Sequence, residues 1–270
     1  MIKQSYLPRN YWETRLSQRF DLTGVGHIAL GPAYNASLYK RRLETLSKGL
    51  AQIKQPLTGA RVFEVGCGTG FYTNYFAKQH VLEYLGLDIT SISTKTLKQR
   101  YPLFYFVCAD IANFAYFHIK ERFDIVFAAD VLFHITEDER FDAALHTMAS
   151  CLKTGGCCII SDIFPQRTVR SATHVHLRSF DTYHQILQKH QLQILHIEPI
   201  FTVLHPPPIK NNSFWWDIYT YIWKIQRSAI KNPIIDKTLP HILEWLDRKI
   251  FCPRYGMSVP NSKWLFARKT

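Results

Sequence analysis

Several segments that would define a protein class are missing from this chain of 270 residues. No run of about 18 uncharged apolar residues occurs, so we expect no membrane-spanning helix. Residues 1–9 lack the apolar stretch of a secretory signal, and we therefore expect a cytoplasmic protein. None of the six cysteines stands in a Cys-x-x-Cys pair, so we expect reduced thiols in a cytosolic core rather than a disulfide framework.

Acidic residues are scarce, since 21 Asp and Glu stand against 33 Lys and Arg, a formal net charge of +12. Residues 201–270 hold eleven of the basic residues and four of the acidic ones, which gives 11 − 4 = +7. Such a surface could attract nucleic acid, anionic lipid or an acidic metabolite, and an ordinary solvated basic face is an equally good interpretation. Because no recognised RNA-binding module occurs, we do not expect nucleic acid as a partner.

Apolar residues, by contrast, make up 47% of the chain, which is enough for a sizeable core and argues against disorder. From residue 61 onward strand-like and helix-like segments alternate, and this rhythm predicts an α/β fold with a doubly wound, mostly parallel sheet. The expected strands are 61–65, 83–88, 103–108, 123–129, 156–162, 192–198 and 263–269. The expected helices between them are 71–79, 91–100, 137–152 and 179–190.

The stretch 61–70 organises the chain. An apolar, β-branched run is followed by glycine at every second position, at Gly66, Gly68 and Gly70, and then by helical apolar spacing. This pattern predicts a strand, glycine loop and helix, at which a nucleotide-like ligand meets backbone N–H groups. Glycine suits the loop because a Cβ would block the tight turn and the approach of the ligand. A dinucleotide fingerprint would need glycine where Phe71 stands, so a dehydrogenase is the least expected alternative.

The pattern Glu-x-Gly-x-Gly-x-Gly resembles the first motif of the class I methyltransferases that use S-adenosyl-L-methionine. The resemblance covers residues 61–200 and 263–270. It implies that Glu64 takes the place of the family's acid, and that the loop holds the amino-acid end of the cofactor. It also implies a seven-stranded sheet whose last strand runs antiparallel beside the fifth. The loop residues that would contact the cofactor are Gly66, Cys67, Gly68 and Gly70.

Two further acids follow expected strands at places where this family contacts its cofactor. Asp88 ends the second strand, about 20 residues beyond the glycine loop, where a carboxylate can accept hydrogen bonds from ribose hydroxyls. Asp110 follows the third strand, and the resemblance implies that it accepts a bond from the adenine amino group. Ile89 or Ile111 would then flank the adenine ring. The alternative role for Asp110 is a helix N-cap.

The fourth expected strand and its continuation also match the family. The run from Phe123 through Asp130 to Ile135 resembles the segment that passes the methyl donor and opens toward the acceptor, so Asp130 is a further candidate cofactor contact. Residues 152–156 match the Leu-x-x-Gly-Gly turn before the fifth strand. Four motifs in the family's order predict S-adenosyl-L-methionine as the cofactor.

Methyl transfer requires donor and acceptor to be held close and aligned, and it needs a base only where the nucleophile keeps its proton at neutral pH. His134 is the candidate catalytic base by position, because imidazole titrates in the useful range. The alternative role for His134 is structural, or a contact on the cofactor side, as for the same histidine in many relatives. Further candidates are Asp162, His174, His176 and His184. Since no Asp, Glu or Cys cluster accompanies the histidine pair, we expect no metal.

The segment 1–58 is expected to form a helical cap over the site. A first helix would carry Tyr11, Trp12 and Leu16 on one face, and a second would run from about residue 33 to residue 53. In methyltransferases that this chain resembles, such a segment forms part of the acceptor pocket. The candidate contributors are His27, Tyr34 and Tyr39, whose alternative role is helix core.

The segment 201–262 is expected to be a helical lid inserted between the sixth and seventh strands of a core formed by 59–200 and 263–270. It opens with a stiff break at 206–208, where three prolines follow one another, and continues with an aromatic-rich run that includes Trp215 and Trp216. A basic, aromatic helix of this kind could also contact a membrane surface peripherally.

These features predict a methyltransferase that acts on a hydrophobic or aromatic small molecule, either free or lipid-linked, because apolar pockets are built from such aromatic side chains. O-methylation is favoured over N- or C-methylation. The alternatives are a macromolecular acceptor, RNA or protein, and a non-catalytic binding protein that keeps the fold. Fold does not settle the acceptor, and the oligomeric state is left open.

Overall fold

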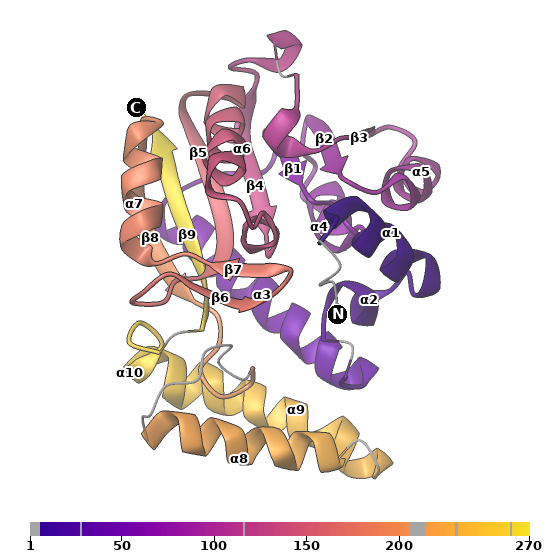
Figure 1. Cartoon of the computed structure of the whole chain (residues 1–270), viewed down its shortest axis with the longest axis vertical. Helices are drawn as coiled ribbons and strands as arrows, with labels where there is room; N and C mark the ends of the chain where they lie inside the picture. The colour runs from indigo at the N-terminus through magenta and orange to yellow at the C-terminus, as the bar shows by residue number, and fades with distance from the viewer. Residues whose placement is uncertain (1–5, 28, 116, 206–213, 230–231, 260) are drawn as a thin grey trace.

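The computed structural model describes residues 6–27, 29–115, 117–205, 214–229, 232–259 and 261–270. Its centre is a seven-stranded sheet in the order β3-β2-β1-β4-β5-β9-β8 (Figure 1). The strands are β1 (Arg61–Val65), β2 (Glu83–Asp88), β3 (Tyr105–Cys108), β4 (Phe123–Ala129), β5 (Leu152–Ile163), β8 (Leu192–Pro199) and β9 (Ser262–Lys269). Pairing is parallel from β3 to β5, and β9 pairs antiparallel with both β5 and β8. The predicted doubly wound sheet and its antiparallel last strand are confirmed.

Both faces of the sheet are buried, because successive residues of a strand point to opposite sides. In β1, Val62 belongs to the apolar cluster on one face and Phe63 to the cluster on the other. The first cluster includes α3 (Pro32–Gln52) and α4 (Phe71–Lys78), the second α6 (Asp138–Cys151) and α7 (Phe180–Lys189), while α5 (Ser91–Arg100) contacts β2 and β3. A two-stranded hairpin, β6 (Val169–Ala172) with β7 (Val175–Leu177), was not predicted.

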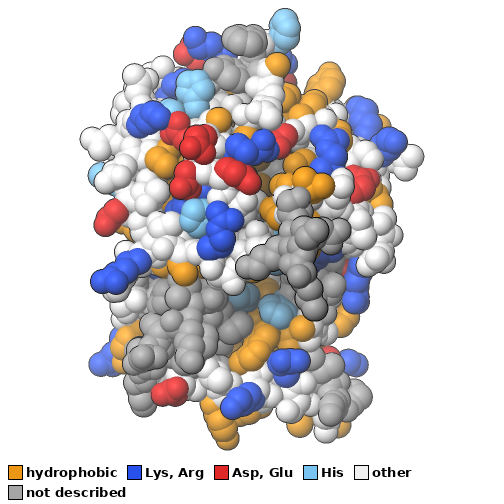
Figure 2. Space-filling model, in the orientation of Figure 1, with side chains coloured by type: hydrophobic (Ala, Val, Ile, Leu, Met, Phe, Trp, Pro, Cys, Tyr) orange, Lys and Arg blue, Asp and Glu red, His pale blue; other side chains and the backbone are white. Residues whose placement is uncertain are grey.

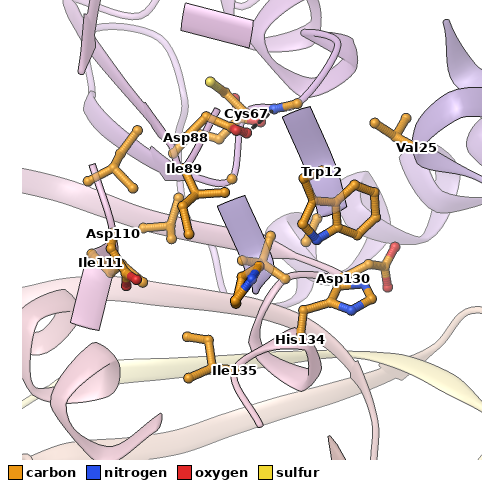
Figure 3. Close-up of a pocket in the computed structure, with 18 of the residues that line it drawn as sticks. Trp12, Val25, Cys67, Asp88, Ile89, Asp110, Ile111, Asp130, His134 and Ile135 are labelled. Carbon is orange, nitrogen blue, oxygen red and sulfur yellow. Dashed lines mark hydrogen bonds between the residues drawn. The ribbon is translucent and has the colours of Figure 1, made fainter. Parts of the chain in front are cut away.

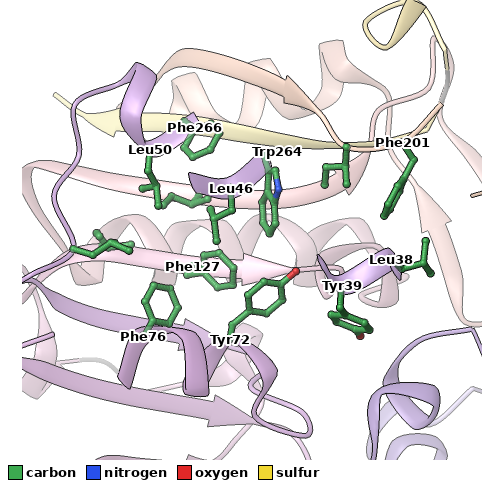
Figure 4. Packing of buried hydrophobic residues seen from close by; sticks show 14 of the residues in the cluster. Leu38, Tyr39, Leu46, Leu50, Tyr72, Phe76, Phe127, Phe201, Trp264 and Phe266 are labelled. Carbon is green, nitrogen blue, oxygen red and sulfur yellow. The ribbon is translucent and has the colours of Figure 1, made fainter. Parts of the chain in front are cut away.

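Helix α3 packs closely on the sheet (Figure 4). Leu46 of this helix is fully buried in the same cluster as Trp264 and Phe266 of β9. Burying side chains of this size stabilises the fold by roughly 1.5–3 kcal/mol each. Gly49 permits the close approach, since a Cβ there would lie 2.2 Å from the Phe266 ring. The Trp264 indole N–H donates to the Arg42 carbonyl at 3.2 Å, which fixes the helix against the strand.

The amino-terminal segment forms α1 (Pro8–Gln18) and the short α2 (Leu22–Val25), which lie beside the sheet at the right of Figure 1. At the start of α2 the Asp21 carboxylate accepts hydrogen bonds from the N–H groups of Thr23 and Gly24. An acidic N-cap of this kind stabilises a helical turn. The segment is therefore a pair of helices joined to α3.

The insertion between β8 and β9 is helical, as predicted. It consists of α8 (Phe214–Ala229), α9 (Pro233–Leu246), the π-helical turn η4 (Asp247–Phe251) and α10 (Cys252–Tyr255). Helix α9 packs on α3 and α8 packs on α9, so both run below the sheet in Figure 1. The three-proline break at 206–208 and the side chains of Trp215 and Trp216 lie outside the described residues. Among the helices that the structure describes, none is long and apolar enough to cross a membrane.

A buried carboxylate fixes the position of this insertion. Asp247 accepts hydrogen bonds from the backbone N–H groups of Thr202, Val203 and Leu204, at 2.7 to 3.0 Å. Burial raises the pKa of Asp247 to about 6, and these hydrogen bonds act in the opposite direction. The end of α9 is thereby held against the turn that follows β8.

Candidate functional site

A cavity of about 150 Å³ lies at the carboxyl ends of β1, β2 and β4 (Figure 3). This is at least ten times the roughly 10–15 Å³ that one water molecule needs. The strand order reverses between β1 and β4, and open α/β sheets bind ligands at such a switch point. All the predicted cofactor contacts except Gly70 line this cavity, and so does His134.

The glycine loop has the backbone that the spacing predicted. Gly66 and Gly68 have φ of +74° and +50°, in the left-handed region that favours glycine. A Cβ on Gly66 would lie 2.3 Å from a methyl of Val131. The loop ends at the N-terminus of α4, whose N-cap residue Gly70 has no side chain to accept from the first backbone N–H groups. These groups are suited to an anionic ligand group such as the carboxylate of an amino acid.

Gly70 lies outside the cavity lining, so the direct contact predicted for it has no support in the lining residues. It starts α4 with φ of +84°, and a Cβ would lie 2.3 Å from a methyl of Leu97. Its role is to turn the chain from the loop into the helix. Cys67 does line the cavity and is buried, and burial raises the pKa of its thiol well above the usual value.

Asp88 holds the loop and faces the cavity. Its Oδ2 accepts the N–H of Gly68 at 2.8 Å, and its Oδ1 accepts the N–H and hydroxyl of Thr90 at 2.9 and 2.7 Å. Burial raises the pKa of Asp88, while the hydrogen bonds from Thr90 and Gly68 lower it. Because Oδ2 accepts one bond within the described chain, it retains a lone pair for a ligand hydroxyl.

Glu64 lies buried at the end of β1. Its Oε2 accepts the hydroxyl of Thr73 at 3.3 Å and that of Tyr84. Burial raises the pKa of Glu64 to about 8, with Asp88 adding to the rise and the two hydroxyls opposing it. A cationic ligand group in the cavity would stabilise the ionised carboxylate. Glu64 therefore fits the ammonium of an amino acid.

Asp110 is a helix N-cap that also lines the cavity. Its Oδ1 accepts the N–H of Ala112 at 3.0 Å and caps the short helix η1 (Ile111–Asn113), so the N-cap alternative is confirmed. Its Oδ2 is paired with Arg140, a residue that the sequence motifs did not identify and that also lines the cavity. Ile89 and Ile111 line the same end, so an apolar ring would fit beside them.

Asp130 lines the cavity but is already paired. Its Oδ2 lies 2.6 Å from Nη1 of the buried Arg42, and its Oδ1 accepts the hydroxyl of Ser161 at 2.7 Å. Its φ of +57° is left-handed, which is uncommon for a residue with a side chain. The ion pair ties the end of β4 to α3 and neutralises the charge at this end of the cavity.

His134 is held under the amino-terminal helices, in the short helix η3 (Leu132–His134). Its Nδ1 lies 2.8 Å from the carbonyl oxygen of His174. A carbonyl only accepts, so Nδ1 carries the proton and Nε2 keeps a lone pair. The ring packs edge-on against Trp12 at 4.9 Å between centroids and parallel to His174 at 5.6 Å. Burial, helped by His174 and Arg15, lowers the pKa of His134 to about 3.

The other chemical candidates do not line the cavity. Asp162 is buried and accepts the Tyr183 hydroxyl and the Ile163 N–H, and burial raises its pKa to about 7. His176 is bonded through Nδ1 to the Thr136 carbonyl at 3.0 Å. His184 is exposed. Within the described ranges no group of three or more His, Cys, Asp or Glu is placed to hold a metal ion.

The amino-terminal helices close the cavity on the side away from the sheet. The residues of this segment that line it are Tyr6, Pro8, Trp12, Leu16 and Val25, with Tyr39 from α3. Of the candidate contributors, Tyr39 is thus placed at the cavity, whereas Tyr34 donates to the Leu204 carbonyl and His27 packs against Trp223. None of the described residues of 201–262 lines the cavity, so the predicted lid is not supported.

Two polar contacts fix α1 over the cavity. The Glu13 carboxylate accepts the N–H groups of Ser91 and Ile92 at 2.8 and 3.1 Å, at the N-terminus of α5. Arg15 donates to the carbonyls of Gly24 and Gly26 at 2.6 and 2.9 Å, around α2. No spacing along the chain indicates the Glu13 contacts, because their partners lie 78 and 79 residues away.

Residues 62–156 match the family model of a methyltransferase domain. No curated protein sequence matches the chain. Among solved structures the chain is similar to magnesium protoporphyrin IX methyltransferase from Synechocystis with bound S-adenosylmethionine, at 15% identity, a TM-score of 0.60, and coverage of 99% of this chain and 100% of that one.

Two further structures show the same arrangement. One is the 1,6-didemethyltoxoflavin-N1-methyltransferase of Burkholderia thailandensis, at 14% identity, a TM-score of 0.54, and coverage of 100% of this chain and 93% of that one. The other is the N-methyltransferase NodS of Bradyrhizobium japonicum, at 19% identity, a TM-score of 0.53, and coverage of 70% and 90%. At these identities the likeness establishes the fold.

Proposed function

We propose that the chain is a class I, Rossmann-like methyltransferase that uses S-adenosyl-L-methionine and methylates a hydrophobic or aromatic small molecule at an oxygen atom. The family-model match over residues 62–156 and the fold shared with the similar structures support this proposal. The observation that carries the proposal is a single cavity with two kinds of wall. Strand-end carboxylates and the glycine loop supply its polar lining, and the aromatic residues Tyr6, Trp12, Tyr39, Phe71 and Tyr72 supply its apolar lining.

In this proposal the cofactor is held by the residues that fit its parts. The open N-terminus of α4 and Glu64 suit its carboxylate and ammonium, Asp88 suits the ribose hydroxyls, and Asp110 with Ile89 and Ile111 suits the adenine. When bound, S-adenosyl-L-methionine supplies an electrophilic methyl group. The contribution of the protein is then to hold an acceptor in line with that group and to exclude water.

His134 is the proposed proton acceptor. Its Nε2 lone pair can receive a hydrogen bond from an acceptor hydroxyl, since Nδ1 is bound to the His174 carbonyl. With a pKa of about 3 in the closed site, the imidazole is a weak base. It therefore orients the hydroxyl first and takes the proton once the oxygen has gained the methyl group and become strongly acidic.

The size and enclosure of the cavity favour a small acceptor over RNA or protein, which would require α1 to leave its contacts with α5. The similar structures named above include enzymes of magnesium protoporphyrin IX and 1,6-didemethyltoxoflavin, which supports a small molecule as acceptor. We place the protein in the cytoplasm and propose that it collects its acceptor at a membrane surface.

The proposal is tested by calorimetric titration with S-adenosyl-L-methionine, S-adenosylhomocysteine and NAD in parallel, on the wild type and on Asp88→Ala. We expect micromolar binding of the two sulfur ligands alone, weakened at least ~100-fold in the variant, which loses both the ribose contact and the bond to Gly68. Glu139→Ala, on the exposed surface of α6, is the matched control. Binding of NAD alone would overturn the assignment. A screen of phenols and lipophilic alcohols then tests the acceptor.

A further inference from the structure

The outer face of α9 is apolar although it faces solvent. Ile234, Ile242 and Trp245 are 74%, 54% and 49% exposed, and their spacing of eight and three residues places them on one side of the helix. The opposite side packs inward, where Leu243 is 5% exposed. On the neighbouring α8, Tyr221 and Ile225 are 68% and 41% exposed. Isolated exposed apolar residues are ordinary, but a row along one helix marks a contact surface.

Cations accompany this apolar row. The exposed charged residues of the described part of 214–259 are one acid, Asp217, and the cations Lys224, Arg227, Lys237, Arg248, Lys249 and Arg254. The remaining acids of the segment are buried or half-buried, as with Glu244 and Asp247. In Figure 2, orange hydrophobic side chains lie beside blue Lys and Arg on the lower part of the molecule, where Figure 1 places α8 and α9.

The apolar and basic residues of this face indicate what kind of partner it binds. An apolar face edged by Lys and Arg is complementary to an anionic bilayer, whose acyl region takes the apolar side chains while its headgroups pair with the cations. Two copies of the chain meeting through the same face would bring like charges together, because a two-fold interface is self-complementary. We propose that the outer face of α8 and α9 docks on an anionic lipid surface, with both helices lying in the plane of the interface.

The inner side of α8 contacts the segment that covers the cavity. Trp223 of α8 packs against His27 with ring centroids 4.8 Å apart, and His27 directly follows the turn held by Arg15. Val25 of that turn lines the cavity. A lipophilic acceptor dissolved in the bilayer would thus meet the enzyme beside the helices that cover its site. The delivery of the acceptor from the bilayer rests on the proposed function, which has an apolar acceptor, whereas the docking of α8 and α9 on lipid does not.

The test is co-sedimentation of the full chain with phosphatidylcholine vesicles that contain or lack phosphatidylserine. The variants are Ile242→Ser/Trp245→Ser for the apolar row and Lys237→Glu/Lys249→Glu for the cations. Leu82→Ser/Leu103→Ser is the matched control, since those two side chains are 67% and 91% exposed elsewhere on the molecule. Each charge reversal should weaken binding at least ~5-fold, from about 1 kcal/mol per cation near the surface.

The expected result is binding that requires phosphatidylserine, falls in both face variants and persists in the control. No binding to either vesicle, or equal loss in the control, would overturn the proposal. Dimers that form without lipid and disappear in Ile242→Ser/Trp245→Ser would assign the face to a second copy instead. Titration with S-adenosylhomocysteine on the same samples separates the two proposals, because vesicle binding without cofactor binding would remove the proposed function and keep the docking.

Discussion

The amino-terminal helices and the helical hairpin formed by α8 and α9 in the insertion between β8 and β9 are both attached to the same sheet. They are attached in different ways. The first is held by polar contacts, Glu13 to α5 and Arg15 to α2, and it lines the cavity. The second packs through apolar side chains on α3, is anchored by Asp247, and lines no part of the cavity with its described residues. Aromatic richness therefore does not identify the segment that covers a site. The contacts that position a segment do.

The largest effect should come from removing the anchor of the hairpin. Asp247→Ala would leave three buried N–H groups without their acceptor, which costs roughly 3 kcal/mol or more of unfolding free energy. Urea denaturation measures the loss, with the exposed Asp217→Ala as control. Folded protein should still bind S-adenosylhomocysteine with wild-type affinity. A variant that loses both stability and affinity would show that the hairpin does support the site.

The next prediction compares how the amino-terminal helices and the hairpin of α8 and α9 contribute to ligand binding. Trp12→Ala removes a ring that lines the cavity, and we expect the dissociation constant for S-adenosylhomocysteine to rise by ~10–100-fold, as about 1.4–2.8 kcal/mol of apolar contact is lost. Trp245→Ala, on the exposed face of α9, should leave it unchanged. Calorimetry on both variants gives the comparison. Equal weakening would mean that the hairpin closes the site.

The sequence supported the sheet and the cofactor end of the site because both depend on local patterns. Strand alternation, the glycine spacing and the acids after β2 and β3 are each contained within a few residues. The acceptor side depends on contacts between distant segments, such as Trp12 with His134 and His134 with the carbonyl of His174, and no spacing along the chain reveals them. The support for a lid has the same limit in the sequence, since only the packing of α9 on α3 shows where the described part of the insertion lies.

A smaller effect is expected at the contact that holds α1. Glu13→Gln removes the negative charge at the N-terminus of α5 and replaces one accepting oxygen with a donor, at a cost of about 0.5–1 kcal/mol. Hydrogen exchange should speed up in α1 and at Ser91 and Ile92, while α8 and α9 keep their protection. Glu139→Gln is the control, because it neutralises an exposed acid outside the contact. Unchanged exchange in α1 would mean that apolar packing alone holds the helix.

The last prediction concerns pH and tests whether the amino-terminal helices exclude water from His134. Its pKa is lowered from 6.5 to about 3, so between these values the unfolded chain binds a proton that the folded chain does not. Stability therefore rises with pH across this window, by at most about 1.4 kcal/mol per unit from this group. His134→Asn, whose amide can still donate to the His174 carbonyl, should flatten the dependence between about pH 4 and 6. The control His184→Asn, at an exposed histidine, should leave the pH dependence unchanged.

Trp12→Ala should also reduce the slope, because water would then reach the imidazole and bring its pKa closer to the usual value. If Trp12→Ala leaves the slope of stability against pH unchanged, residues of the sheet domain rather than α1 exclude water from His134.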